Sequence, residues 1–110
     1  MDDRIVPLEQ TSLDRAAALI KCLGHPLRLR LLEAMEDGER TVTDLAHLLG
    51  APQPVVSQQL GILRGRGVVS ATRRGPHVFY GITEPKVQRI LDCIRTCDDV
   101  RPNGAPAAAS

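Results

Sequence analysis

Two short amphipathic segments on either side of a glycine constrain the fold of this chain more than any other feature. Residues 44–49 and 54–64 each carry apolar side chains at helical spacing, and Gly50 stands between them, where a glycine commonly ends a helix. The side chains predicted to face inward are Leu45, Leu48 and Leu49 in the first segment and Val56, Leu60 and Leu63 in the second. With Thr43 as N-cap of the first segment, the pattern predicts two short helices joined by a turn.

The other expected elements place this helix pair in a mainly α domain with a small β-hairpin. Further helices are predicted from Thr11 or Ser12 to Gly24, from Pro26 to the break at 37–38, and over 84–97 after an N-cap at Thr83. A short strand is predicted at 40–42, and a hairpin with strands 68–73 and 77–82 around the turn 74–76. The folded domain then spans 11–97, and residues 1–10 and 98–110 are predicted to be tails.

The composition fits packed helices and limits the other classes. One Phe and one Tyr are the only aromatic residues, so the core must be aliphatic. No segment is apolar enough for a membrane span or a signal peptide, which predicts a cytoplasmic protein without membrane partners. There is also no Gly-rich phosphate loop, no pair of carboxylates in a plausible cleft and no Ser, His and Asp set, so the chain is predicted not to be an enzyme.

Charge is concentrated in one part of a nearly neutral chain. The net charge is +1, but no Asp or Glu occurs between Asp44 and Glu84, a stretch that contains four Arg. A local basic segment of this kind is suited to contact with a polyanion. The outward face of the 54–64 helix agrees with this, because it carries amide, hydroxyl and guanidinium groups but no carboxylate: it consists of Gln53, Pro54, Ser57, Gln58, Gly61 and Arg64.

Two helices, a turn and a basic hairpin together predict a winged helix-turn-helix that binds double-stranded DNA. Gln58 has the donor and acceptor that pair with adenine, Arg64 can reach guanine or phosphate, and Ser57 suits phosphate. The hairpin can lie along the DNA backbone or enter the minor groove. The predicted DNA-binding residues are Gln53, Ser57, Gln58, Gln59, Arg64, Arg73, Arg74 and His77. A helical hairpin with an ordinary solvated face, or a winged helix that binds another protein, is the alternative.

The chain resembles the ArsR/SmtB family of winged-helix repressors in residues 23–32, 55–64, 67–69, 73–75 and 78–80, in unbroken order within 12–97. The resemblance implies a homodimer, formed by the first and last helices, that blocks a promoter until an inducer binds. A twofold dimer requires an inverted-repeat operator, so the expected partner is double-stranded DNA of that kind. Two positions depart from the family. Many members have His in place of Gln59, which makes Gln58 the stronger candidate for reading bases, and Pro76 stands where a charged wing tip is common.

The resemblance does not supply a metal site. The cysteine pair of some members corresponds here to Thr41 and Thr43, and the zinc ligands of others to Glu84, Lys86, Cys97 and Val100, where a charged lysine cannot ligate.

The remaining candidates for the inducer site are Cys22, Cys93 and Cys97. Cys93 and Cys97 are one helical turn apart, so their thiols share a face of the helix and could hold a soft ion such as arsenite, As(III), with a third thiol from Cys22 or a partner chain. The alternatives are a sensor of reactive sulfur or oxidants, a thiol redox or metal-buffer protein, and simple packing of small apolar residues. DNA binding itself is predicted to need no cofactor.

Overall fold

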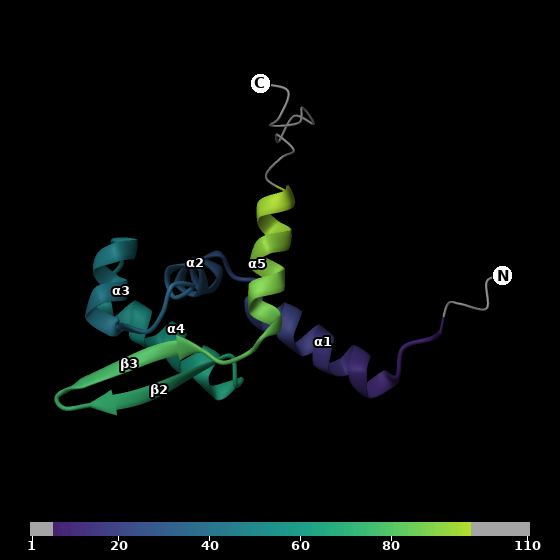
Figure 1. Ribbon diagram of the computed structural model, residues 1–110, viewed down its shortest axis with the longest axis horizontal. Coiled ribbons are helices and arrows are strands. Elements are labelled where there is room, and N and C mark those ends of the chain that lie inside the picture. The colour runs from purple at the N-terminus through teal and green to yellow at the C-terminus, as the bar shows by residue number, and fades with distance from the viewer. Residues whose placement is uncertain (1–5, 98–110) are drawn as a thin grey trace, which may run out of the picture.

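The structure, a computed structural model, describes residues 6–97 as five helices and three strands (Figure 1). In chain order they are α1 (Gln10–Leu23), α2 (Pro26–Ala34), β1 (Arg40–Thr41), α3 (Val42–Leu49), α4 (Gln53–Gly65), β2 (Val69–Arg74), β3 (His77–Ile82) and α5 (Lys86–Cys97). Most of the predicted N-terminal tail (1–5) and the whole C-terminal tail (98–110), which contains Val100, lie outside the described residues. Within the described part, every helix is too short or too polar to cross a bilayer.

The core is aliphatic, as the composition predicts. Its fully buried side chains come from α2, α3, α4, the residue just before β2 and the start of α5, and they are Leu31, Leu32, Leu45, Val56, Leu60, Leu63, Val68 and Val87. Val56, Leu60 and Leu63 form the predicted inward face of α4. Leu48 was expected inward and is 54% exposed, so that prediction is wrong. Leu49, one residue further along, packs against the core instead, so the face of α3 that meets the core runs through Leu45 and Leu49 and leaves Leu48 beside it, toward solvent.

Two predicted helix caps are wrong by a few residues. Thr41, rather than Thr43, caps α3, because its hydroxyl accepts a hydrogen bond from the backbone N–H of Asp44 (3.1 Å). Thr83 does not cap α5: its hydroxyl donates to the Gly67 carbonyl, and α5 begins at Lys86, whose N–H donates to the Glu84 carboxylate. Pro85 explains the shift, since a proline disfavours the helical conformation for the residue before it.

The sheet is antiparallel, in the order β1-β3-β2. β2 and β3 form the predicted hairpin, with Ala71 opposite Tyr80 and Arg74 opposite His77. The short strand β1 pairs with β3, placing Arg40 opposite Tyr80. Tyr80 and Ile82 pack against the core, so the base of the hairpin is fixed to the helices while its tip extends away from them (Figure 1).

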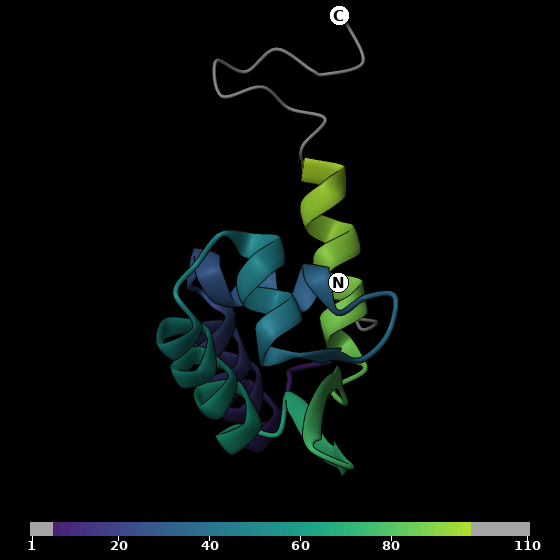
Figure 2. The same ribbon diagram turned by 90° about the vertical axis from the view of Figure 1, so that its left-hand side faces the viewer.

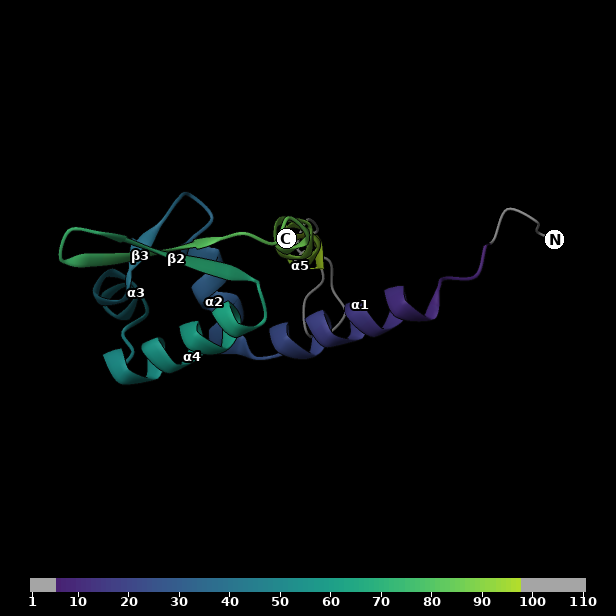
Figure 3. The same cartoon turned by 90° about the horizontal axis from the view of Figure 1, so that it is seen from below.

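The first and last helices are the least covered by the rest of the chain. α1 extends away from the other helices, and α5 crosses it steeply, being seen end-on in the view that shows α1 along its length (Figure 3). Only Cys22 and Leu23 are buried in α1. The apolar side chains of Leu13, Ile20 and Ile94 are exposed. A single copy of the chain therefore leaves an apolar surface on these two helices uncovered.

Candidate nucleic-acid interface

The helix-turn-helix is formed by α3 and α4, which pack side by side (Figure 2). Gly50 ends α3 in the left-handed conformation (φ 63°), which glycine adopts without steric cost, and its N–H and that of Ala51 bond to the last turn of α3. The chain then turns at Pro52, whose carbonyl accepts the first hydrogen bonds of α4. Each predicted part of this motif is present.

The outward face of α4 carries four of the eight predicted DNA-binding residues. Gln53, Ser57, Gln58 and Arg64 are all exposed on this helix, while its inward residues are completely buried. Gly61 lies on the same face, and a Cβ built there would meet nothing within 4 Å. Because α4 has no acidic residue in its first turn and ends in a basic one, this face offers hydrogen-bonding groups and positive charge without a carboxylate.

Gln59 differs from the other predicted DNA-binding residues. It is half-buried, and its Oε1 accepts a hydrogen bond from Arg28 Nε at 2.8 Å. With that oxygen engaged, Gln59 cannot present the donor and acceptor pair that reads adenine unless the bond to Arg28 breaks. Gln58 is exposed, whereas the side-chain oxygen of Gln59 is engaged within the protein.

The wing places its two arginines on opposite faces of the hairpin, since side chains alternate along a strand. Arg73 follows Ala71 on the face that carries Tyr80 toward the core, and Arg74 shares the other face with His77 and Phe79. Gly75, with φ at 64°, supplies the tight turn. Arg73 is exposed, has no acidic partner within residues 6–97, and makes only a long contact (3.5 Å) with the Gly75 carbonyl.

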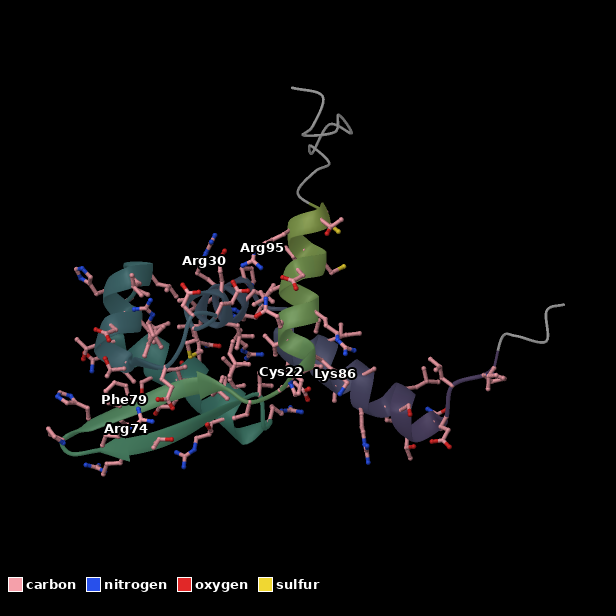
Figure 4. The ribbon with its side chains drawn as sticks, in the orientation of Figure 1. Cys22, Arg30, Arg74, Phe79, Lys86 and Arg95 are labelled. Atoms are coloured by element: carbon pink, nitrogen blue, oxygen red, sulfur yellow. The ribbon has the colours of Figure 1, made fainter. Side chains whose placement is uncertain are left out.

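Arg74 is held by the protein itself. Its Nη1 donates to Glu39 Oε1 at 2.5 Å, and its guanidinium carbon lies 5.2 Å from the centre of the Phe79 ring (Figure 4). A Cβ at Gly81 would lie only 3.0 Å from Glu39 Cγ, so the glycine leaves room for this carboxylate to cross the sheet. Sequence reasoning missed the pair, because Glu39 precedes the acid-free stretch and only the pairing of β1 with β3 brings it to the wing.

His77 is exposed at the start of β3. Its ring stacks edge-on against Phe79, with 6.4 Å between centroids. The wing thus presents His77 and Arg73 to solvent on its two faces, close to its tip.

The three cysteines are in two different environments. Cys22 is buried, with 4% of its surface exposed, whereas Cys93 and Cys97 are exposed on α5. Cys22 and Cys93 both line a cavity of about 910 Å³ between α1 and α5, with Leu19 and Ile90 among its walls, but Cys97 does not line it. Within residues 6–97 of one chain, no three His, Cys, Asp or Glu side chains are grouped to hold a metal ion.

An ion-pair cluster joins α5 to the segment after α2. Arg95 donates to the carboxylate of Glu36 and to Asp92, and Gln88 donates to Glu36 as well. The hydrogen bond from Arg95 holds the pKa of the Glu36 carboxyl below its ordinary value, although partial burial acts in the opposite direction. This cluster links α5, at Gln88 and Arg95, to the turn that follows α2.

Comparison with known proteins agrees with this geometry. A family model described as "Bacterial regulatory protein, arsR family" matches residues 25–71. The chain is 39% identical over 83 residues to the biofilm growth-associated repressor of Xylella fastidiosa, covering 76% of this chain and 73% of that protein.

Solved structures show the same fold. The AntR antimony-specific transcriptional repressor superposes with a TM-score of 0.79 at 32% identity, covering 86% of each chain. The homodimeric winged helix-turn-helix domain of a possible ArsR-family regulator from Mycobacterium bovis superposes with a TM-score of 0.70 at 28% identity, covering 86% of this chain and 91% of that one. These matches confirm the predicted fold class and family resemblance, and they confirm the expectation of a regulator rather than an enzyme.

Proposed function

The chain belongs to the ArsR family of DNA-binding transcriptional repressors, and from this premise we propose that it binds an inverted-repeat operator as a homodimer and is released when an inducer binds its cysteine thiols. The observation that carries the DNA-binding part is the outward face of α4. This face is exposed, free of carboxylates and rich in hydrogen-bonding groups. A helix of this kind fits the major groove, with the wing beside it on the backbone.

Gln58 and Arg73 have different proposed roles. Gln58 reads a base, so Gln58→Ala should reduce discrimination between operator and unrelated DNA by about 1 to 3 kcal/mol. Arg73 contacts phosphate, so Arg73→Ala should weaken binding to all DNA alike. It should also lower the salt slope, the steepness with which log affinity falls against log salt concentration, by about one. Fluorescence anisotropy over a range of salt concentrations measures both quantities.

Arg30→Ala is the matched control for Arg73→Ala, since it removes an exposed side chain of the same kind on α2, away from α1, α4 and α5. If Gln58→Ala bound operator and unrelated DNA as the wild type does, the assignment of α4 as the reading helix would be wrong.

The homodimer is supported by the apolar surface of α1 and α5. Leu13, Ile20 and Ile94 are exposed in one copy, and a second copy related by a twofold axis would cover them. The relative from Mycobacterium bovis is described as homodimeric. A twofold dimer sets its two reading helices about 34 Å apart, one turn of DNA, which requires an inverted repeat. Sedimentation that shows a stable monomer at micromolar concentration would contradict this part of the proposal.

The inducer is proposed to be a soft metalloid, with arsenite first. Cys93 and Cys97 are exposed one turn apart on α5, where two thiols can bind a single ion and a third can come from Cys22 or the partner subunit. In this reaction each thiol replaces one hydroxyl of arsenous acid and one water leaves. The relative AntR is described as antimony-specific, which supports the same class of ligand. Reactive sulfur species or oxidants are the second candidates for the inducer.

Release would follow from the position of these thiols on a dimer helix. An inducer that binds the DNA-free form better by about 3 kcal/mol lowers operator affinity roughly 150-fold, and DNA weakens inducer binding by the same factor. Cys93→Ser and Cys97→Ser are each expected to leave operator binding intact and to abolish release by arsenite or antimonite. Cys22→Ala removes a buried thiol, and release from the operator by the same two metalloids then shows whether Cys22 takes part in inducer binding. If the Cys93 and Cys97 double variant still released DNA with both metalloids, the sensor would lie elsewhere.

A further inference from the structure

One side chain of α2 connects the end of α1 to the middle of α4. Arg28 is half-buried, its Nε donates to Gln59 Oε1, and its Nη1 donates to the backbone carbonyl of Cys22, each at 2.8 Å. The two acceptors belong to helices that are far apart in sequence. A single planar guanidinium with both bonds in place fixes their relative position, because its donors have a rigid geometry.

The Cys22 carbonyl has no partner within its own helix. Its normal partner would be the N–H of the residue four positions later, but that residue is Pro26, which has none. Arg28 therefore satisfies a carbonyl at the C-terminus of α1 that would otherwise be unpaired, and it places a positive charge at the negative end of the helix dipole. The last turn of α1, which contains Cys22, depends on this bond.

The other bond determines how Gln59 is oriented. Arginine can only donate, so the amide oxygen of Gln59 must face Arg28 and its NH₂ group must face away. Gln59 is next to Gln58, the proposed base-reading residue, on a helix whose remaining contacts with the core are apolar and without direction. The bond to Arg28 is thus a directional constraint on the rotation of α4 about its own axis.

We propose that Arg28 is a positioning residue for operator recognition: its guanidinium couples the last turn of α1 to the DNA-reading helix α4, so that the two move together. The inference rests on the proposed role of α4 in reading DNA. It goes beyond that proposal in giving a physical connection between the helix predicted to form the dimer and the helix that reads the operator.

Arg30 is the matched control. It lies two residues further along α2, on the opposite face of the helix, and among residues 6–97 its exposed side chain pairs only with Glu33 of the same helix. Arg30→Met removes the same charge and the same number of atoms as Arg28→Met without touching α1 or α4. A difference between these two variants in hydrogen exchange or operator binding is therefore due to the bonds of Arg28 and not to the loss of one positive charge.

Native-state hydrogen exchange of the full chain tests the coupling without DNA or inducer. Arg28→Met is expected to accelerate exchange by about tenfold both in the last turn of α1 and in α4 around Gln59, while Arg30→Met changes neither. Arg28→Lys, which keeps the charge but can reach only one acceptor, is expected to restore protection at one of the two helices. Acceleration in only one helix with Arg28→Met, or equal acceleration with Arg30→Met, would overturn the proposal.

Operator binding tests the consequence. Arg28→Met and Gln59→Leu should each lower the ratio of operator to unrelated-DNA affinity by about tenfold, and the double variant should lose no more than either single variant, because both changes break the same bond. Additive losses, or an equal loss of affinity for both DNAs, would overturn it. If the wild type failed to prefer any operator, the proposed function would fail, while hydrogen exchange would still decide the coupling.

Discussion

Gly61 gives a prediction in which stability and DNA binding change in opposite directions. It lies in the interior of α4, on the exposed face, and a Cβ added there meets nothing within 4 Å in the free protein. Its backbone φ is not in the left-handed region, so alanine fits without strain. Because glycine is about 1 kcal/mol less favourable than alanine inside a helix, Gly61→Ala should raise the free energy of unfolding by about 0.5 to 1 kcal/mol.

In the DNA complex the same methyl group would lie on the surface that enters the groove. One turn of helix separates Gly61 from Ser57, and Gln58 is close by on the same face, so the added methyl stands between α4 and the DNA. Overfilling a packed contact by one carbon costs about 1 to 3 kcal/mol, which corresponds to a loss of at least about fivefold in operator affinity. The variant should therefore be more stable and bind more weakly.

Urea unfolding and anisotropy with operator DNA measure the two effects on one preparation. Arg30→Ala on α2 is the control: it also gains helix propensity at an exposed position, about 0.5 kcal/mol or less, and should not affect operator binding. If Gly61→Ala gained stability and bound the operator as tightly as the wild type, the outward face of α4 would not approach DNA closely, and the reasoning would be refuted.

Two further predictions concern the ion pairs. Glu39→Gln should free Arg74, raise affinity for all DNA a few-fold at low salt and steepen the salt dependence by about one ion, whereas an unchanged salt slope in anisotropy titrations would show that Arg74 does not reach phosphate. Glu36 has a pKa lowered by Arg95, so its charge stabilises the fold above the ordinary glutamate range and that contribution is lost as pH falls through the lowered pKa. Urea unfolding from neutral to acid pH should thus show a smaller loss of stability for Glu36→Gln than for the wild type, and equal losses would contradict the assignment.

Local patterns along the chain predicted most of the fold. The helix-turn-helix follows from apolar spacing around Gly50, and the hairpin follows from alternation around Gly75. The caps are less predictable, because Thr41 and Thr43 are both acceptable N-cap residues. The choice falls on Thr41 because β1 ends there and α3 begins at the next residue.

The candidate site was predicted as a set of exposed residues, and the structure divides that set. Gln58 and Arg73 are exposed as expected, whereas Gln59 and Arg74 are bonded to Arg28 and Glu39. Those partners lie 31 and 35 residues away, so no local pattern indicates them. Charge counted along the sequence treats Arg73 and Arg74 as equal, and the strand pairing makes them different.

Binding to operators of different half-site spacing tests the central claim most directly. The assay is anisotropy of the full chain with an inverted repeat whose half-site centres are one helical turn apart, compared with the same half-sites separated by about five further base pairs, which is half a turn. A dimer that reads DNA with two α4 helices held on one face should prefer the first by at least about tenfold, and the preference should persist as salt weakens both affinities. Equal affinity for the two spacings would contradict the account.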